Sequence, residues 1–282
     1  MSRVFRALEK AEEEKKQGVT EEFSLRLFKG KAPIEKEETS SRSPEEMEGS
    51  LGIAARGEDP FLMVPPHSFA EEEFRKLRTQ IFRRLPNPPH SILITSALPG
   101  EGKTMVSVNL AIAMSKEIHK KAVLVDADLR KPAIHVEQSK IAKGLSHYLS
   151  EGASLSDVLM DSEVRNLKVI MAGNPSPRSS ELIGSRKMAE LLTLLGKSDE
   201  GVYTLLDSPP IISTTEPTLL SRMVEGIILV VMADRVPRES VERALRSIDR
   251  EKIIGIVFNQ CDVRRSGYYS GYDYKHYRKS NV

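Results

Sequence analysis

The sequence predicts an α/β protein built on a doubly wound, largely parallel sheet with helices on both faces. The first observation is a series of short apolar runs that do not alternate with polar residues, at residues 92–95, 122–126, 167–171, 202–207, 226–232 and 253–258. Runs rich in Val, Ile and Leu are typical of strands that are covered on both faces. The second observation is that helix-like segments fill the gaps, at residues 103–118, 179–195, 216–223 and 238–249. Strand and helix alternation of this kind predicts parallel strands joined by crossover helices.

The N-terminal part of the chain has a different composition. Residues 2–16 predict a short helix with one apolar side, and they suit either a docking peptide or a frayed, charged end. Residues 17–66 are rich in Glu, Lys, Ser and Pro, which predicts a solvated linker. We therefore expect three parts, namely a charged extension over residues 1–66, a folded domain over 67–262 and a flexible tail over 263–282.

The folded domain is predicted to begin with a helix that ends before Pro86. Ser68 and Glu71 have the spacing of a capping box, which is typical of a helix N-terminus. Within this helix Glu72, Arg75 and Arg78 lie about one turn apart. Such a row suits either a solvated helix face or ion pairs between subunits.

A phosphate-binding loop is predicted after the first apolar run. Residues 97–104 read Ala-Leu-Pro-Gly-Glu-Gly-Lys-Thr, which is the spacing of a P-loop with Ala in place of the first Gly. Backbone N–H groups of such a loop point inward and, with the following helix N-terminus, bind phosphate oxygens. Lys103 would reach the terminal phosphates, and the Thr104 hydroxyl would ligate Mg²⁺. The fold class is therefore that of P-loop NTPases.

Carboxylates follow two further apolar runs. Asp126 and Asp128 come at the end of one run, and Asp207 ends another. Ligands of open α/β sheets bind at the carboxyl ends of the strands, so these side chains are expected near the P-loop. Asp207 has the position of a Walker B aspartate. Asp126 and Asp128 would supply a metal contact and a general base. Aspartates at strand ends also cap turns, but three of them beside a P-loop favour a catalytic site.

Composition excludes several classes of protein. The net charge of +2 argues neither for nor against nucleic acid, and a single cysteine, Cys261, excludes an internal disulfide and cysteine-ligated iron–sulfur or zinc sites. No apolar run approaches the roughly 18 residues that span a bilayer. The single cysteine also fits a reducing cytosol, so we expect a cytoplasmic protein, which something else must bring to a membrane if it works there.

In this order the motifs resemble those of the bacterial tyrosine kinases of exopolysaccharide and capsule biosynthesis. The family has an Ala- or Gly-started Walker A loop, an Asp-x-Asp-x-Arg motif (here residues 126–130), a Walker B motif ending in Asp-Ser-Pro-Pro (207–210) and a C-terminal tyrosine cluster. The cluster here is Tyr268, Tyr269, Tyr272, Tyr274 and Tyr277. The family also has a Glu-x-x-Arg-x-x-Arg segment used in ring assembly, which Glu72, Arg75 and Arg78 match.

The resemblance implies a role for each of these residues. ATP would be bound by the P-loop and a residue after the last strand, namely Pro99, Gly100, Glu101, Gly102, Lys103, Thr104, Met105 and Asn259. Mg²⁺ would be held by Thr104, Asp207 and Asp128, while Asp126 would take the proton of the acceptor tyrosine. Catalysis would rest on Lys103, Asp126 and Asp128. Asn259 would contact the nucleotide base, although Asn is also a common turn former.

The resemblance also implies partners. The protein would assemble with itself into a ring. Some family members are fused to a transmembrane adaptor, whereas this chain has a long charged N-terminal extension. The resemblance therefore implies a separate membrane-embedded polysaccharide co-polymerase that activates the protein and holds it at the inner face of the plasma membrane. The chain departs from the family in its basic tail and in Glu216, at a helix start that more usually contains Asp.

The tail has more than one interpretation. Five of the seven tyrosines lie between residues 268 and 277, among Arg and Lys. We expect autophosphorylation of a neighbouring subunit's tail, since tethering keeps the acceptor concentrated. Aromatic residues between basic ones also suit nucleic-acid binding, which we favour less, and a solvated tail without function is the third interpretation.

Two other functions remain open from the sequence. A partitioning-type ATPase switch would position cargo or bind nucleic acid without phosphorylating protein. Leu98 stands where those ATPases have an extra lysine, which favours the kinase. A nucleotide-sensing regulator with negligible catalysis is the other alternative.

Overall fold

The computed structural model describes residues 53–55, 63–136, 143–197 and 201–261. The predicted helix at residues 2–16, most of the N-terminal extension and the tail tyrosines lie outside these residues.

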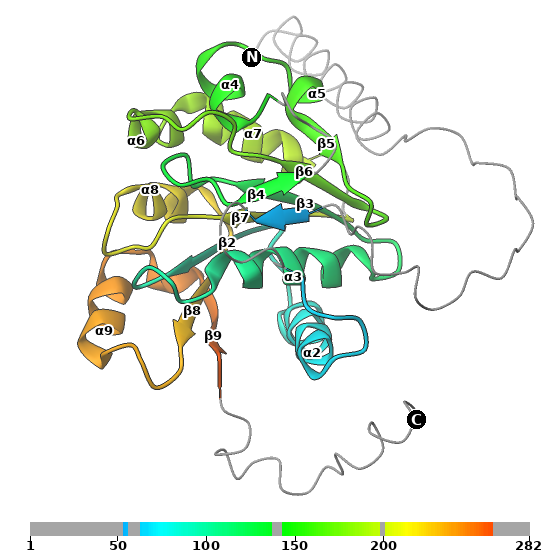
Figure 1. Ribbon diagram of the computed structural model, residues 1–282, viewed down its shortest axis with the longest axis vertical. Helices are drawn as coiled ribbons and strands as arrows, with labels where there is room; N and C mark the ends of the chain where they lie inside the picture. Colours follow the sequence, from blue (N-terminus) through cyan, green and yellow to red (C-terminus); the bar gives the residue numbers. More distant parts are fainter. Residues whose placement is uncertain (1–52, 56–62, 137–142, 198–200, 262–282) are drawn as a thin grey trace, which may run out of the picture.

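A seven-stranded sheet forms the centre of the molecule, with the strand order β5-β6-β3-β7-β2-β8-β9 (Figure 1). The parallel strands are β2 (Ser91–Ser96), β3 (Lys121–Asp126), β6 (Leu167–Ile170), β7 (Val202–Asp207), β8 (Gly226–Met232) and β9 (Ile253–Asn259). The remaining strand, β5 (Leu159–Asp161), runs antiparallel to β6 at one edge. The doubly wound, largely parallel sheet is thus confirmed, and each predicted apolar run matches a strand to within one residue at either end.

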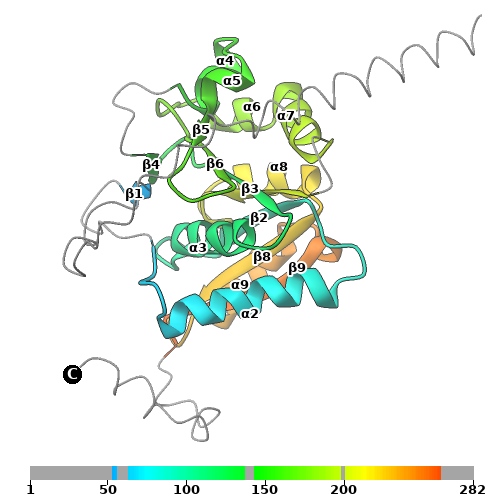
Figure 2. The ribbon, with the colours of Figure 1, turned by 90° about the vertical axis from the view of Figure 1, so that its right-hand side faces the viewer.

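Helices cover both faces of this sheet (Figure 2). On one face α2 (Phe69–Arg84) lies against α3 (Lys103–Ser115). The other face carries α4 (Leu145–Ser150), α5 (Leu155–Val158), α6 (Ser179–Ile183), α7 (Arg186–Lys197), α8 (Glu216–Met223) and α9 (Arg238–Arg246). A 3₁₀ turn, η2 (Arg250–Lys252), leads into β9. Apart from the main sheet, β1 (Ile53–Ala55) pairs antiparallel with β4 (Ile134–Val136).

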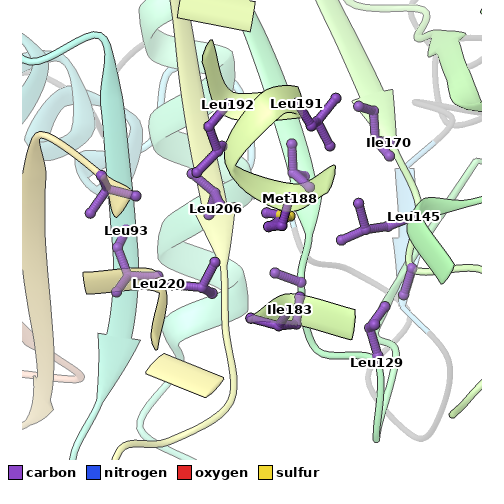
Figure 3. Close-up of a cluster of buried hydrophobic side chains, with 14 of the residues drawn as sticks. Leu93, Leu129, Leu145, Ile170, Ile183, Met188, Leu191, Leu192, Leu206 and Leu220 are labelled. Atoms are coloured by element: carbon purple, nitrogen blue, oxygen red, sulfur yellow. The ribbon is translucent and has the colours of Figure 1, made fainter. Parts of the chain in front are cut away.

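The larger hydrophobic core lies between the sheet and α7 and α8 (Figure 3). Leu93 and Leu206 project from β2 and β7, Met188 and Leu191 from α7, and Leu220 from α8, each with 0% of its surface exposed. Burying one such side chain is worth about 1.5–3 kcal/mol relative to leaving it in water. These contacts keep the central strands, and hence the loops at their carboxyl ends, in place.

The structure differs from the predicted elements in several places. Helices α4 and α5 were not predicted, and the helix predicted over residues 238–249 ends at Arg246. The helix predicted over residues 179–195 is two helices, since α6 ends at Ile183 with Gly184 as its C-cap and α7 begins at Arg186. The helix predicted to reach Ile118 ends at Ser115, where Lys116 is its C-cap. The strands β1, β4 and β5 have three residues each and were not predicted, because three residues carry no readable periodicity.

Within the described part of the chain, none of the helices is long and apolar enough to cross a membrane.

Candidate functional site

The P-loop connects β2 to α3 through two glycines in the left-handed region. Gly100 has a φ of 81° and Gly102 a φ of 84°, a conformation that other residues rarely adopt. Gly102 is also closely packed, since a Cβ there would lie 2.0 Å from Asn259 Nδ2. The helix begins at Lys103, so the first amides of α3 face the same space as the loop. This geometry is that of an anion-binding cradle.

Two residues that the sequence associated with the nucleotide hold the P-loop in shape. Glu101 is 2% exposed, and its carboxylate accepts hydrogen bonds from Leu98 N and, at 3.3 Å, from Met232 N. Asn259 Nδ2 donates to Glu101 O at 3.0 Å. Burial raises the pKa of Glu101, and the backbone amides that bond to it oppose that rise. The side chain of Glu101 therefore lies in the protein interior, and the loop is fastened to the ends of β8 and β9.

Asp207, at the end of β7, lies beside the start of α3. Its side chain is buried, and Oδ1 accepts a hydrogen bond from Ser107 Oγ at 3.0 Å. Burial raises the pKa of Asp207, while the Lys103 ammonium and the Thr104 hydroxyl oppose the rise. Oδ2 is buried and has no donor among the described residues. A buried carboxylate oxygen without a donor, beside a threonine hydroxyl, fits a Mg²⁺ ion or one of its waters.

Asp126, at the end of β3, is held by backbone amides. Oδ1 accepts from Asp128 N at 3.0 Å, and Oδ2 accepts from Ala133 N and Ile134 N, both at 3.0 Å. Burial raises the pKa of Asp126 to about 7, and the Asp207 carboxylate adds to the rise, although the three amides oppose it. A carboxylate that titrates near neutral pH can take up a proton during catalysis.

Asp128 lies two residues further along the same loop. It is 6% exposed, and its Oδ1 accepts from Arg130 N at 3.3 Å and from Lys131 N at 2.9 Å. Asp126 and Asp128 are thus oriented by the turn that follows them, as aspartates often are.

Strand order brings these groups together. In the sheet, Asp207 of β7 is in register with Asp126 of β3 on one side and with Ile94 of β2 on the other. The P-loop leaves β2 just after this position. The carboxyl ends of all three strands therefore lie at the same end of the sheet, as the sequence predicted. Within the described residues, no cluster of three or more His, Cys, Asp or Glu side chains forms an all-protein metal site. Mg²⁺ commonly binds through one or two carboxylates together with substrate phosphates, which suits this arrangement.

The sequence did not single out Ser107, which orients Asp207. Ser107 Oγ also lies 2.9 Å from Lys103 O, one helical turn earlier. Its spacing of four residues from Lys103 is the signal that could have indicated a side chain facing the site.

The predicted assembly residues lie on α2, away from the P-loop. Arg75 and Glu72 form an exposed pair at 3.3 Å. Arg78 is 18% exposed and binds Glu117 Oε2 at 2.9 Å and Ala113 O at 3.1 Å, near the end of α3 opposite Lys103. Arg78 thus helps to fasten α2 to α3 within the chain.

Known proteins of similar sequence and fold are P-loop NTPases and bacterial tyrosine kinases. Residues 87–268 match the family model described as ParA: NUBPL iron-transfer P-loop NTPase. The chain is 30% identical over 217 residues to tyrosine-protein kinase YwqD of Bacillus subtilis, covering 76% of this chain and 90% of that protein. It is also 30% identical over 217 residues to tyrosine-protein kinase CpsD of Streptococcus pneumoniae, covering 73% of this chain and 93% of that one. The kinase domain of the Escherichia coli tyrosine kinase ETK superposes with a TM-score of 0.66 at 27% identity, covering 83% of this chain and 89% of that domain.

Proposed function

The chain belongs to the family of bacterial P-loop tyrosine-protein kinases, and we propose that it phosphorylates the tyrosines of its own C-terminal tail with Mg²⁺ and ATP. Five of the seven tyrosines lie in this tail, and a tethered acceptor reaches roughly millimolar effective concentration. The acceptor tyrosines are Tyr268, Tyr269, Tyr272, Tyr274 and Tyr277.

In this proposal the P-loop amides and Lys103 bind the phosphates of ATP. Thr104, Asp207 and Asp128 are the residues that would hold Mg²⁺, which neutralises charge on the phosphates when bound. The orphaned Oδ2 of Asp207 supports this assignment. The contact of Asn259 with the nucleotide base stays a prediction, and its Nδ2 already donates to the P-loop.

Asp126 is our candidate for the base that accepts the tyrosine proton. Its pKa, raised to about 7, suits a base at neutral pH. Oδ1 accepts one hydrogen bond, from Asp128 N, so a lone pair remains for an acceptor hydroxyl. The observation that carries the proposal is the register of Asp126 with Asp207, next to the strand that bears the P-loop.

Regulation and partners follow from the same proposal. Each phosphotyrosine would add about −1.5 to −2 charges to a basic tail, which would weaken a ring held by charge complementarity. Glu72 and Arg75 are exposed on α2 and would supply ion pairs between subunits. A membrane-embedded co-polymerase would hold the kinase at the cytoplasmic face and link it to polysaccharide polymerisation or export.

The test is phosphotyrosine mapping by mass spectrometry after incubation with Mg-ATP. We compare the wild type with Lys103→Met, Asp126→Asn and a matched control, Asp161→Asn, which lies on the edge strand β5. Phosphate on the tail that is lost in the first two variants and kept in the control is the expected result. ATP hydrolysis without phosphotyrosine, even with the cytoplasmic segment of a membrane partner present, would refute the autokinase and favour an ATPase switch.

A further inference from the structure

A buried glutamate that the proposed chemistry does not use lies next to the loop that carries Asp126 and Asp128. Glu216 is the first residue of α8, and its side chain is 1% exposed. Its Oε1 lies 2.7 Å from Nε of Arg130, whose side chain is 47% exposed. Arg130 follows Asp128 by two residues, so the ion pair joins the loop after β3 to the start of α8.

The same carboxylate oxygen also binds the start of α6. Ser179 Oγ and Ser180 Oγ both donate to Glu216 Oε1, the latter at 3.1 Å. Arg130 Nη2 in turn donates to Ser180 Oγ at 3.2 Å. One glutamate therefore connects three segments that are far apart in the sequence.

The other oxygen of Glu216 is unusual. Oε2 is buried and has no hydrogen-bond donor among the described residues. Buried polar atoms are nearly always paired in folded proteins, so an orphaned oxygen indicates a group that stability alone does not explain. Burial raises the pKa of Glu216, but hydrogen bonds from Ser179 and Arg130 outweigh it and lower the pKa to about 2. Glu216 is therefore charged throughout the neutral range.

The ion pair reaches the candidate catalytic groups through the backbone. Arg130 N donates to Asp128 Oδ1 at 3.3 Å, and Asp128 N donates to Asp126 Oδ1 at 3.0 Å. A shift of residue 130 therefore moves the amide that orients Asp128, and Asp128 in turn supplies an amide that orients Asp126. The P-loop has a separate support, since Glu101 and Asn259 fasten it to β8 and β9.

We propose that Glu216 is a positioning residue for phosphoryl transfer, which acts by holding Arg130 so that the loop carrying Asp126 and Asp128 keeps its place beside the P-loop. The inference rests on the proposed kinase function. Two buried glutamates then stabilise different parts of the site. Glu101 holds the loop that binds nucleotide, and Glu216 holds the loop that bears the proposed base.

The test compares Glu216→Gln with Glu101→Gln, two isosteric changes that each remove one buried carboxylate. For Glu216→Gln we expect kcat for tyrosine phosphorylation to fall at least tenfold, with the Kd for ATP within twofold of the wild type. For Glu101→Gln we expect the Kd for ATP to rise. In a double-mutant cycle, Arg130→Gln should add little to Glu216→Gln, because the two residues act as one unit. Glu216→Asp, which restores the charge, should recover part of kcat.

Hydrogen exchange supplies a measurement that does not depend on kinase activity. Glu216→Gln should speed amide exchange in peptides covering residues 126–134 but not in those covering 97–105, and Glu101→Gln should do the opposite. Equal loosening of both segments, additive effects of Arg130→Gln and Glu216→Gln, or a folded Glu216→Gln with unchanged kcat would overturn the proposal. A wild type that makes no phosphotyrosine would instead refute the proposed function, while the exchange experiment would still decide the inference.

Discussion

Asp126 and Asp207 occupy the same register position of two neighbouring parallel strands, β3 and β7. The two ends are also joined by the backbone, since Ala127 N donates to Asp207 O at 2.8 Å. Both side chains are fully buried, which raises the pKa of each, and the Asp207 carboxylate raises the pKa of Asp126 further. Like charges this close favour sharing of protons and cations, which is the property that a metal-assisted transfer site needs.

The pH dependence of catalysis should reflect Asp126. Because burial and Asp207 raise its pKa to about 7, Asp126, our proposed base, should lose its proton near neutral pH. We expect kcat/KM for tail phosphorylation to rise as the pH increases from 6 to 8. Initial rates at saturating Mg²⁺, measured across this range, give the profile. A rate that is flat between these values would show that Asp126 is not the titrating base.

The free energy of unfolding should fall as the pH rises, whereas the activity should increase. The pKa of Asp126 in the folded state is above its ordinary value of 3.8, so folding favours the protonated form. The stabilisation is present below about pH 3.8 and is lost as the pH rises toward 7, a change on the order of 3–4 kcal/mol. Asp126→Asn does not titrate, so the wild type should lose stability relative to this variant between pH 4 and 7. Urea unfolding of both proteins measures the difference, and parallel curves would contradict it.

Two glycines of the P-loop offer a matched pair of substitutions. Gly102→Ala should abolish tight nucleotide binding, because its Cβ would lie 2.0 Å from Asn259 Nδ2 in addition to the strain of a φ of 84°. Gly100→Ala has similar strain, but no protein atom lies within 4 Å of the new Cβ. The free energy of ATP binding should therefore weaken by only about 1 kcal/mol. Fluorescent ATP titration distinguishes the two. Recovery of binding in Gly102→Ala combined with Asn259→Ala would identify the clash as the cause.

Glu71 should stabilise the start of α2 above acidic pH. Its carboxylate binds Lys116 Nζ at 2.9 Å and His67 N at 2.6 Å, and the hydrogen bond from Lys116 leads the causes that lower its pKa to about 2. This stabilisation is present above about pH 4.5 and is lost as the pH falls toward 2. We expect Glu71→Gln to cost about 1 kcal/mol at pH 7, since salt bridges near the surface are weak. Glu73→Gln, whose exposed partner is Lys76, is the control and should change thermal stability by less than half as much.

The core beneath the sheet should be sensitive to truncation. Leu206→Ala removes a side chain with no exposed surface and should destabilise the protein by about 2–5 kcal/mol. Leu194→Ala, on the outer side of α7 with 37% of the residue exposed, should cost less than about 1 kcal/mol. Denaturant titration checks both, and equal costs would place Leu206 outside the cooperative core.

Much of the fold could be predicted because several elements carry clear local signals. Val202–Asp207, Gly226–Met232 and Glu216–Met223 have the predicted bounds, since an uninterrupted apolar run or a Pro near the helix start marks each of them. The break between α6 and α7 depends on Gly184, and a single glycine inside a helical pattern is no certain stop signal.

The candidate site could be predicted only as a set of strand ends. The convergence of Lys103, Asp126 and Asp207 follows from parallel strands, whose carboxyl ends share an edge. The inward direction of Glu101 could not be predicted, because one of its donors, Met232 N, comes from a strand 131 residues later. The pairing of Arg130 with Glu216 spans 86 residues and depends in the same way on how the crossover helices pack.

The position of β2 in the middle of the sheet affects when the protein becomes able to bind nucleotide. Its two neighbours, β7 and β8, begin at residues 202 and 226, which are 98 and 122 residues after Thr104, the last residue of the P-loop. At translation rates of about 5–20 residues per second, the loop would wait many seconds before the strands on both sides of it exist. Contacts between such distant segments also form slowly during refolding. A nascent chain would therefore become competent for ATP only near the end of its synthesis, shortly before the tail tyrosines that we propose as acceptors emerge.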